Sequence, residues 1–512
     1  MKKALSLLLA LVMVLSLVAC GKAPAAEPAQ PAADAPETKP AAEAPAEGEI
    51  VNLVVLHRGN VGNTMEKEVI AELNRYSAEK IGVTITWIPV DAAEFGERLS
   101  RMIAAKDELD LTFVASYTGY ADLVAKGGLM DITDMLHSDE YAELLDLMPK
   151  AVWDSSTIKG RNYCVPNYKE TPFVTTLVTP VALADTIKEK YGVDFNAIEI
   201  GSYRELDKLN PYLDACIAEG VKYPMLTNEL DNFIGQYMRS DTKYELIGTD
   251  ARMPYVMNKE THEVSNMFEN PDFIDWFEIM TSWNEKGYWH EDNIPIEWNP
   301  RDQWSLDTWG IYPQNGIPDN AAQQSISMGQ PVYSINMGPA TITANGSLGS
   351  TWAIPAHSQK AEAAMKWIKL IQTDRYFADT YIYGIEGVNY NRISEDVVEV
   401  IPNSGWSNGR WKTCNYENAS ITTADSPDLK AKYEEFNNAG VLAELASFTP
   451  DFTAVESEKA AVQAVLNEVY HLYTLGFMTK DDLADTVASF KAAGDDVIIA
   501  ELQKQVDEFF GN

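Results

Sequence analysis

The sequence predicts an α/β protein whose first lobe is built on a doubly wound parallel sheet. Strand-like and helix-like segments alternate from residue 50 onward, at residues 50–57, 64–80, 83–90, 93–105 and 109–115. The first of these is a dense apolar run, as in a parallel strand that is buried on both faces. The second places Met65, Val69, Leu73 and Tyr76 at helical spacing. This β-α-β-α-β order is typical of a doubly wound α/β sheet.

The remainder of the chain predicts a second lobe and a helical C-terminal region. Helices are expected near residues 181–191, 202–219, 271–286, 360–372, 455–473, 480–493 and 495–510. Thr479 is a good N-cap for the helix that follows it. Phe273, Trp276, Phe277, Met280 and Trp283 form one helical stripe, which we interpret as core. The chain from residue 49 to 512 is long enough for two large lobes.

The first twenty residues have the layout of a secretory signal peptide. Lys2 and Lys3 precede an apolar run over residues 4–18, and Leu17-Val18-Ala19-Cys20 looks like a bacterial lipobox. We expect a signal peptide at residues 1–19, cleavage before Cys20, and a lipid on the Cys20 thiol. The run is shorter than the roughly 20 residues of a membrane span, although an N-terminal membrane helix is the alternative.

Residues 20–48 are expected to form a stalk between that cysteine and the folded lobes. Residues 22–48 consist almost entirely of Ala, Pro and acidic side chains, without Val, Ile, Leu or an aromatic residue. Such a segment has no apolar surface to bury and stays disordered. The lipid would then be the sole attachment of the protein to the membrane.

The charge of the chain excludes one class of partner. With 76 acidic against 40 basic residues, the formal net charge is −36. A surface of that sign repels nucleic-acid phosphates and anionic headgroups, so no nucleic-acid partner is expected. Apart from Cys20, the cysteines are Cys164, Cys216 and Cys414, which we expect to be buried free thiols, and neither they nor the histidines have metal-site spacing. No metal or cofactor is predicted.

No catalytic motif is found in the sequence. The segment Gly346-Ser347-Leu348-Gly349 is not a nucleophile elbow, and there is no HExxH motif and no phosphate-binding loop. We therefore expect a protein that is not an enzyme. A glycosidase carboxylate pair remains an alternative, because its defining feature is a spatial separation.

Aromatic and amide residues in loops indicate a site for a sugar. Sugar C–H faces stack on aromatic rings, while hydroxyls bind carboxylates, amides and guanidinium groups. Ligands of doubly wound sheets bind beyond the carboxyl ends of the strands. Those ends, and the aromatic loops, supply the candidates His57, Arg58, Asn60, Tyr117, Tyr168, Glu170, Trp309, Trp352, Trp406 and Trp411.

The late part of the sequence resembles the family 1 extracellular solute-binding proteins of ABC importers, carbohydrate type. The matching segments are residues 351–354 (TWAI), 361–367 (AEAAMKW), 383–390 (YGIEGVNY), 492–494 (AAG) and 501–507 (ELQKQVD). They are similar to a lipoprotein subgroup that has a YGIEG segment and a characteristic C-terminal domain. The resemblance extends over residues 49–512.

The resemblance implies a two-lobed, type II periplasmic-binding-protein-like fold with a hinge and an interlobe cleft. Lobe one would be residues 49–178 plus 352–391, and lobe two residues 179–351 plus 392–512. The chain would cross between them near residues 171–180 and 340–352, with a third crossing after Tyr390. Glu386 joins the candidates here, or instead fixes the turn between Gly384 and Gly387.

The implied function is a monomeric, lipid-anchored receptor on the outer face of the bacterial cytoplasmic membrane. It would capture a sugar or oligosaccharide by hinge closure and deliver it to ABC permease subunits. Arg58 and Glu170 would bind hydroxyls and the aromatic side chains would stack. The alternatives are the same receptor for a peptide or other small polar solute, and a surface glycan hydrolase.

Overall fold

A computed structural model describes residues 50–59, 61–227, 241–247, 253–294, 298–412 and 414–511. They all belong to one unit that spans Pro45–Asn512. The predicted signal peptide at residues 1–19, Cys20 with the stalk at residues 20–48, and the candidate Asn60 lie outside these residues.

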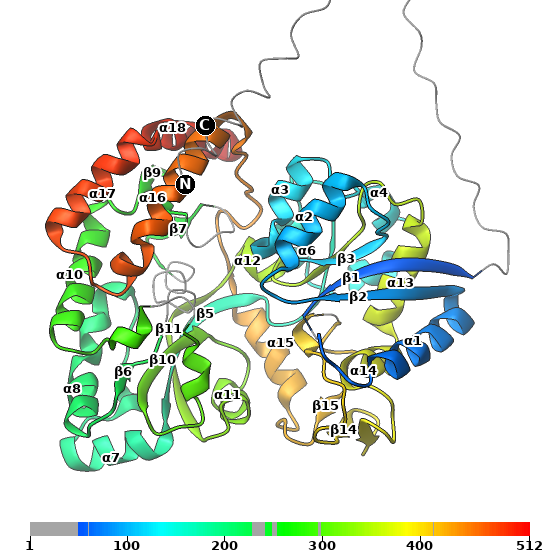
Figure 1. Ribbon diagram of the computed structural model, residues 1–512, viewed down its shortest axis with the longest axis horizontal. Helices are drawn as coiled ribbons and strands as arrows, with labels where there is room; N and C mark the ends of the chain where they lie inside the picture. The colour runs from blue at the N-terminus through cyan, green and yellow to red at the C-terminus, as the bar shows by residue number, and fades with distance from the viewer. Residues whose placement is uncertain are drawn as a thin grey trace, which may run out of the picture. The chain divides into compact units, whose positions relative to one another are not determined.

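The first sheet has five strands in the order β2-β1-β3-β12-β4. Figure 1 shows β3, β1 and β2 side by side in this sheet. Their bounds are β1 Val51–Arg58, β2 Val83–Val90, β3 Leu111–Val114, β12 Thr351–Ala353 and β4 Val165–Pro166. β1 runs parallel to β2 and β3, whereas β12 is antiparallel to β3 and β4. The predicted doubly wound order is therefore confirmed for the first three strands.

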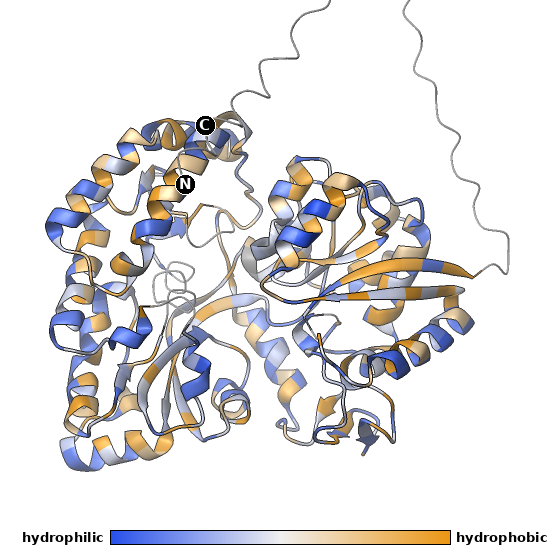
Figure 2. Cartoon of the chain, viewed as in Figure 1, coloured by the Kyte–Doolittle hydropathy of each residue, from blue (hydrophilic) through white to orange (hydrophobic). Residues whose placement is uncertain are grey.

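Burial on both faces explains why β1 lies inside the first sheet. Leu53, Val54, Val55 and Leu56 are all buried, and Figure 2 shows β1 and β2 largely in the hydrophobic colour. The helices around this sheet are α1 Glu66–Ile81, α2 Phe95–Ala105, α3 Tyr120–Ala125, α4 Thr133–Leu136, α5 Ala142–Asp146, α6 Lys150–Ser156, α13 Ala361–Thr373 and α14 Arg375–Tyr383. A 3-10 turn, η1 Ser116–Thr118, follows β3.

The second sheet has the order β16-β11-β5-β10-β6. Its strands are β16 Val441–Leu442, β11 Val332–Ile342, β5 Pro172–Pro180, β10 Trp309–Asn315 and β6 Tyr223–Met225. Two three-stranded sheets complete the described strands: β7 Tyr244–Leu246, β8 Tyr255–Asn258 and β9 Val264–Asn266, and β13 Tyr390–Arg392, β14 Val397–Val400 and β15 Ile421–Thr422.

The helices that follow β5 include the predicted core stripe. Phe273, Trp276, Phe277, Met280 and Trp283 are all buried on α10, which confirms that interpretation. The elements are α7 Val181–Tyr191, η2 Phe195–Ala197, η3 Tyr203–Leu209, α8 Asn210–Ala218, α10 Pro271–Glu285, η5 Glu291–Asn293, η6 Pro300–Gln303 and α11 Asn320–Met328.

The C-terminal region is helical, as predicted. It comprises η8 Thr453–Val455, α16 Glu456–Thr474, α17 Lys480–Ala492 and α18 Asp495–Phe510. Thr479 caps α17, since its hydroxyl accepts the Asp482 N–H and the Asp482 carboxylate accepts the Thr479 N–H. Among the helices that the structure describes, none is both long and apolar enough to cross a membrane.

Within the described residues, the chain passes between the two sheets in three segments. The first lies between β4 and β5, the second holds α12 Ala344–Ser347 between β11 and β12, and the third holds α15 Leu429–Ala439 between β15 and β16. The first two fall within or beside the predicted crossings. The third comes after the β13-β14-β15 sheet, which itself begins at Tyr390.

The hydrophobic cores follow the sheets rather than the predicted lobe boundary at residue 391. Val398, Trp406, Cys414 and Ala419 belong to the same core cluster as β1 and α13. The β13-β14-β15 sheet, from the first part of the residues 392–512 that we expect in lobe two, packs on this core. We therefore propose that the third crossing, near α15, ends lobe one.

The three crossings meet at Thr171. Its N–H donates to Asn437 Oδ1 of α15 at 2.9 Å, and Asn437 Nδ2 donates to the Lys169 carbonyl at 3.0 Å. From the second crossing, Gly346 approaches so closely that a Cβ there would lie 2.0 Å from the Thr171 carbonyl oxygen. A side chain at position 346 would thus clash with the Thr171 backbone, and Asn437 is needed for its two hydrogen bonds to the first crossing.

We predict that Asn437→Ala lowers the free energy of unfolding by about 1–3 kcal/mol, because a buried N–H and carbonyl lose their partner. Urea denaturation of the variant and the parent measures the difference. Asn438→Ala, an exposed position on the same helix, is the matched control and should change stability by less than about 0.5 kcal/mol. Equal losses in both variants would contradict the assignment.

Candidate functional site

Two predicted site residues lie at the carboxyl edge of the first sheet. Arg58 ends β1 and pairs with Val90, the last residue of β2. Tyr117 lies in η1, directly after β3. Gly59 turns the chain away from the sheet with a φ of 78°, and its N–H donates to the Val90 carbonyl at 2.6 Å. Because β1 and β3 are parallel, both side chains emerge at one edge.

Four side chains form what we call the strand-end cluster: Arg58, Tyr117, Trp411 and Lys412. The Arg58 guanidinium lies 5.3 Å from the Tyr117 ring centroid, and the Lys412 amino group 5.9 Å from that of Trp411. Trp411 also packs on the edge of Phe113 of β3, at 6.3 Å. Tyr117 and Trp411 expose 52% and 39% of their surface, so both rings are available to a ligand.

Electrostatics in the cluster is dominated by two neighbouring cations. Burial, followed by the charge of Arg58, lowers the pKa of Lys412 to about 8. A Cβ on Gly59 would lie 3.5 Å from Lys412 Nζ, which places this ammonium over the backbone next to Arg58. Burial, then Lys412, and to a smaller extent Arg58 hold the pKa of His57 well below its usual value, so its imidazole is neutral.

Asn167 fixes the backbone of Lys412. Its Nδ2 donates to the Lys412 carbonyl at 2.8 Å and to Ser350 Oγ at 2.8 Å. Its Oδ1 accepts from Gln372 Nε2 at 2.6 Å. Asn167 is buried and lies in the first crossing, and its hydrogen bonds join the Lys412 backbone to the first crossing and to Ser350 of the second.

Paired charges border the cluster. Glu170 lies 3.0 Å from Lys169, and Arg410, beside Trp411 in η7 Arg410–Lys412, pairs with Asp425 at 3.0 Å. Asp425 also accepts from Gln323 Nε2 of α11 at 2.9 Å. Burial opposes ionisation of Asp425, but Arg410 and these hydrogen bonds lower its pKa overall. Asp425 thereby connects the cluster to a helix of the second lobe.

Five other predicted residues lie in the core. His57 stacks on Trp87 at 4.5 Å, Trp352 packs on Trp367 at 5.2 Å, and Tyr168 packs on Tyr416 at 5.1 Å. Trp309 Nε1 donates to the Trp304 carbonyl, and Trp406 Nε1 to that of Tyr381. All five are at most 5% exposed. As they lie here they stabilise the lobes, so of the predicted residues the site that we propose keeps Arg58, Tyr117, Glu170 and Trp411.

Glu386 lies apart from the cluster. It pairs with Arg392 at 3.3 Å, which also binds Asp379. In the turn between Gly384 and Gly387, which is the alternative role for Glu386, Asn389 Oδ1 accepts the Ile385 N–H and the Asn389 side chain packs against Gly384.

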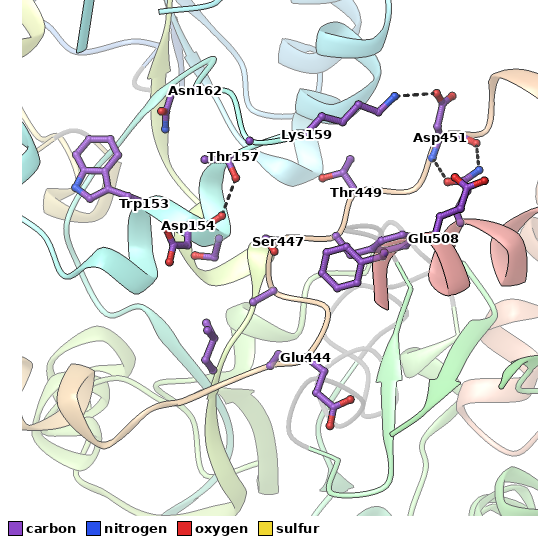
Figure 3. A pocket seen from close by; sticks show the side chains of 18 of the residues that line it. Trp153, Asp154, Thr157, Lys159, Asn162, Glu444, Ser447, Thr449, Asp451 and Glu508 are labelled. Carbon is purple, nitrogen blue, oxygen red and sulfur yellow. Dashed lines mark hydrogen bonds and ion pairs between the residues drawn. The ribbon is translucent and has the colours of Figure 1, made fainter. Parts of the chain in front are cut away.

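A cavity of about 1260 Å³ lies elsewhere, between α6 and the C-terminal region. Figure 3 shows Trp153 and Asp154 on one side, with Ser447, Thr449, Asp451 and Glu508 on the other. Lys159 crosses it to Asp451 at 3.6 Å. It contains none of the predicted residues. Its Trp153 ring is buried and donates to the Leu145 carbonyl, so that ring does not offer a face as Tyr117 and Trp411 do.

Sequence reasoning missed Lys412 and Asn167. The run Arg410-Trp411-Lys412 places two cations around a tryptophan in a strongly acidic chain, and that contrast could have indicated Lys412. Asn167 carries no such signal, because its partners come from segments about 180 and 245 residues away. In the described residues, no group of His, Cys, Asp and Glu is arranged to hold a metal ion.

Two lobes on separate sheets, three crossing segments and a cluster at strand ends define a type II periplasmic-binding-protein-like fold. The chain belongs to the bacterial extracellular solute-binding protein family, whose sequence profile matches residues 58–376. Residues 444–510 match a domain of unknown function, DUF3502. These matches confirm the resemblance that the YGIEG and C-terminal segments indicated.

Similar proteins span nearly the whole chain. A carbohydrate ABC transporter substrate-binding protein of Streptococcus pneumoniae is 22% identical and covers 87% of this chain and 88% of its own. The N-glycan transport solute binding protein NgtS of the same species has a TM-score of 0.78 at 19% identity, over 90% and 99% of the two chains. An HMO-binding ABC-transporter associated protein of Bifidobacterium longum infantis has a TM-score of 0.58 at 14% identity, over 90% and 99%. The solved structures establish the fold.

The depressed pKa of Lys412 predicts a pH dependence of stability. The pKa is about 8 in the folded protein and 10.5 without these surroundings. Between these values the unfolded chain binds more protons, so the free energy of unfolding rises with pH. We expect Lys412→Met to be more stable than the parent at pH 7, with the difference shrinking as pH rises from about 8 to about 10.5, by at most about 1.4 kcal/mol per unit.

Urea denaturation from pH 7 to pH 10 measures this difference. Lys126→Met, at an exposed position of the same lobe, is the control and should follow the parent at every pH. A constant offset between Lys412→Met and the parent would show that the ammonium is not buried beside Arg58.

Proposed function

We propose that this protein is a non-enzymatic receptor that captures a sugar or oligosaccharide and delivers it to an ABC importer. The strand-end cluster carries the proposal, because it offers two exposed aromatic rings and two cations at the carboxyl edge of a parallel sheet. Membership of the solute-binding family supports the receptor role. The names of the relatives, a carbohydrate ABC transporter substrate-binding protein and an N-glycan transport protein, support a glycan as the solute.

The chemistry of the cluster suits a pyranose. Tyr117 and Trp411 each offer a ring to a C–H face, and an aromatic contact of this kind contributes about 0.5–1.5 kcal/mol beyond area burial. The Arg58 fork donates to vicinal hydroxyls, and Glu170 accepts from a hydroxyl if its pair with Lys169 opens. Stacking and hydrogen bonding therefore come from different side chains, which fixes the orientation of the ring.

Capture would proceed by closure of the two lobes. The crossings meet at Thr171, and Asp425 reaches from Arg410 to Gln323 of α11. A ligand that contacts both lobes only when they are closed shifts the population toward the closed form. A permease can then distinguish loaded from unloaded receptor.

We propose further that the receptor is a monomer, held on the outer face of the cytoplasmic membrane by a lipid on Cys20. The stalk at residues 20–48 would let it move near the permease and raise their effective concentration.

A glycan panel, read by tryptophan fluorescence and melting temperature, tests the receptor role. We expect Tyr117→Ala and Trp411→Ala each to weaken binding of the best glycan about tenfold, since a lost stack costs about 1.4 kcal/mol. Tyr191→Ala is the matched control, because Tyr191 is also exposed, by 44%, but lies on α7. Binding of peptides without a response to any glycan would overturn the sugar assignment.

The anchor predicts where the protein is found. Cys20→Ala should move it from the membrane fraction to the soluble fraction, because a lipid cannot attach. Cys164→Ala changes a buried thiol and should leave the protein in the membrane fraction. Immunoblots of both fractions measure the split, and retention of Cys20→Ala in the membrane would contradict a lipid at this position.

A further inference from the structure

Two amide groups at one edge of the second sheet are buried without an acceptor. Gln314 lies next to the end of β10, and Asn320 is the first residue of α11. Gln314 Nε2 and Asn320 Nδ2 are both buried and have no hydrogen-bond partner among the described residues. Asn320 as a whole is only 8% exposed. A buried N–H group without an acceptor is costly, which points to an acceptor that is bound there.

The strand register places these amides at the hinge end of the second sheet. β10 runs antiparallel to β5, and Asn315 at the end of β10 pairs with Thr175. Thr175 lies near the start of β5, shortly after Thr171, where the three crossings meet. Gly316 continues the contact, since its N–H donates to the Val174 carbonyl at 2.7 Å. The two amides therefore lie at the end of the sheet from which β5 leads to the first lobe.

Contacts of Asp319 hold the start of α11 against the first lobe. The Asp319 carboxylate accepts the Ser426 hydroxyl at 2.6 Å and pairs with Lys432 of α15 at 3.1 Å. Figure 1 shows α11 beside α15, in agreement with this pair. One turn further along α11, Gln323 donates to Asp425, which borders the strand-end cluster. The first turn of α11 thus lies next to the residues that flank the cluster.

The N-terminus of α11 adds further donors. The first N–H groups of a helix have no acceptor within the helix. The side chain of the N-cap residue Asp319 makes no capping hydrogen bond, since its carboxylate is bound to the first lobe. Asn320 Oδ1 accepts the Ile317 N–H at 3.3 Å, which leaves Nδ2 of the same side chain without an acceptor in the described chain. This edge therefore presents hydrogen-bond donors, which bind oxygen acceptors.

On the basis of the proposed sugar-receptor function, we propose that Gln314 and Asn320 are the second lobe's part of the sugar site. Their amide N–H groups would donate to hydroxyl or ring oxygens of the glycan. The first lobe would hold the same glycan through Arg58, Tyr117 and Trp411. A glycan held by both lobes gains the two amide hydrogen bonds only when the lobes close, so these bonds stabilise the closed form.

Stabilisation of the free receptor does not account for the two amides. Without a ligand each N–H₂ group is removed from water and gains no hydrogen bond to the described residues. An apolar side chain of similar length would avoid that cost. Replacement of the Gln314 amide should therefore weaken binding without loss of stability, whereas a structural role predicts loss of both.

Calorimetry with the purified full chain measures binding of maltotriose, cellotriose, mannotriose, triacetylchitotriose and the rest of the glycan panel. We expect Gln314→Met and Asn320→Ala each to weaken binding of the tightest glycan about tenfold, as the loss of one hydrogen bond allows. Asn320→Ala also removes the acceptor of the Ile317 N–H, so its binding is measured well below its melting temperature.

Melting temperatures without glycan supply the second measurement. Gln314→Met should melt no lower than the parent, because the amide that it lacks has no acceptor in the free receptor. Asn196→Ala is the control for both measurements, since Asn196 is an exposed amide of η2 in the second lobe. It should bind and melt like the parent.

The outcomes separate this inference from the proposed function. Unchanged affinity in either variant, or a weaker Gln314→Met that also melts lower than the parent, overturns the assignment of the second lobe and leaves the sugar receptor intact. If no glycan of the panel binds the parent, the sugar-receptor function fails, and the assignment fails with it.

Discussion

The hydrogen bonds between Asn437 and the backbone at Lys169 and Thr171 are the contact on which the two-lobed arrangement depends. All three crossing segments converge there, since Asn437 comes from the third, Thr171 from the first, and Gly346 of the second packs against the Thr171 carbonyl. Gly440 is equally confined, because a Cβ there would lie 2.5 Å from Pro172. Lobe movement must therefore pivot around a tightly packed point, while the segments on either side bend.

The same short stretch of the first crossing also positions the candidate site. Asn167 binds Ser350 of the second crossing and the carbonyl of Lys412, and Glu170 lies one residue before Thr171. The pivot and the site thus share residues 167–171. A ligand bound at Arg58 and Trp411 would therefore lie close to the Asn437–Thr171 contact around which the lobes pivot. A small change in geometry near a pivot has a large effect on the orientation of the lobes.

Sequence reasoning succeeded where the signal is local. The strands β1 to β3 are continuous apolar runs, and parallel topology then places Arg58 and Tyr117 at one edge without knowledge of the rest. It could not separate exposed from buried tryptophans. Trp352 lies in β12, which inserts between β3 and β4 from far along the chain, and Trp411 stays exposed in η7. The sequence around Trp352 and Trp411 does not distinguish them, because contacts with distant parts of the chain determine which tryptophan is exposed.

Placing the Lys412 ammonium beside Arg58 is unfavourable, and contacts of the surrounding backbone hold Lys412 in this position. Its carbonyl is held by Asn167, its N–H by the Gly409 carbonyl at 3.1 Å, and its segment by the Arg410–Asp425 pair. Without these supports, repulsion would swing the ammonium into water, where a lysine keeps its usual pKa. A fold that fixes two like charges together gives up stability at that point, and such local conflicts concentrate where a protein binds its ligand. The contacts that hold the Lys412 backbone are therefore evidence, in addition to its charge, that Lys412 belongs to the site.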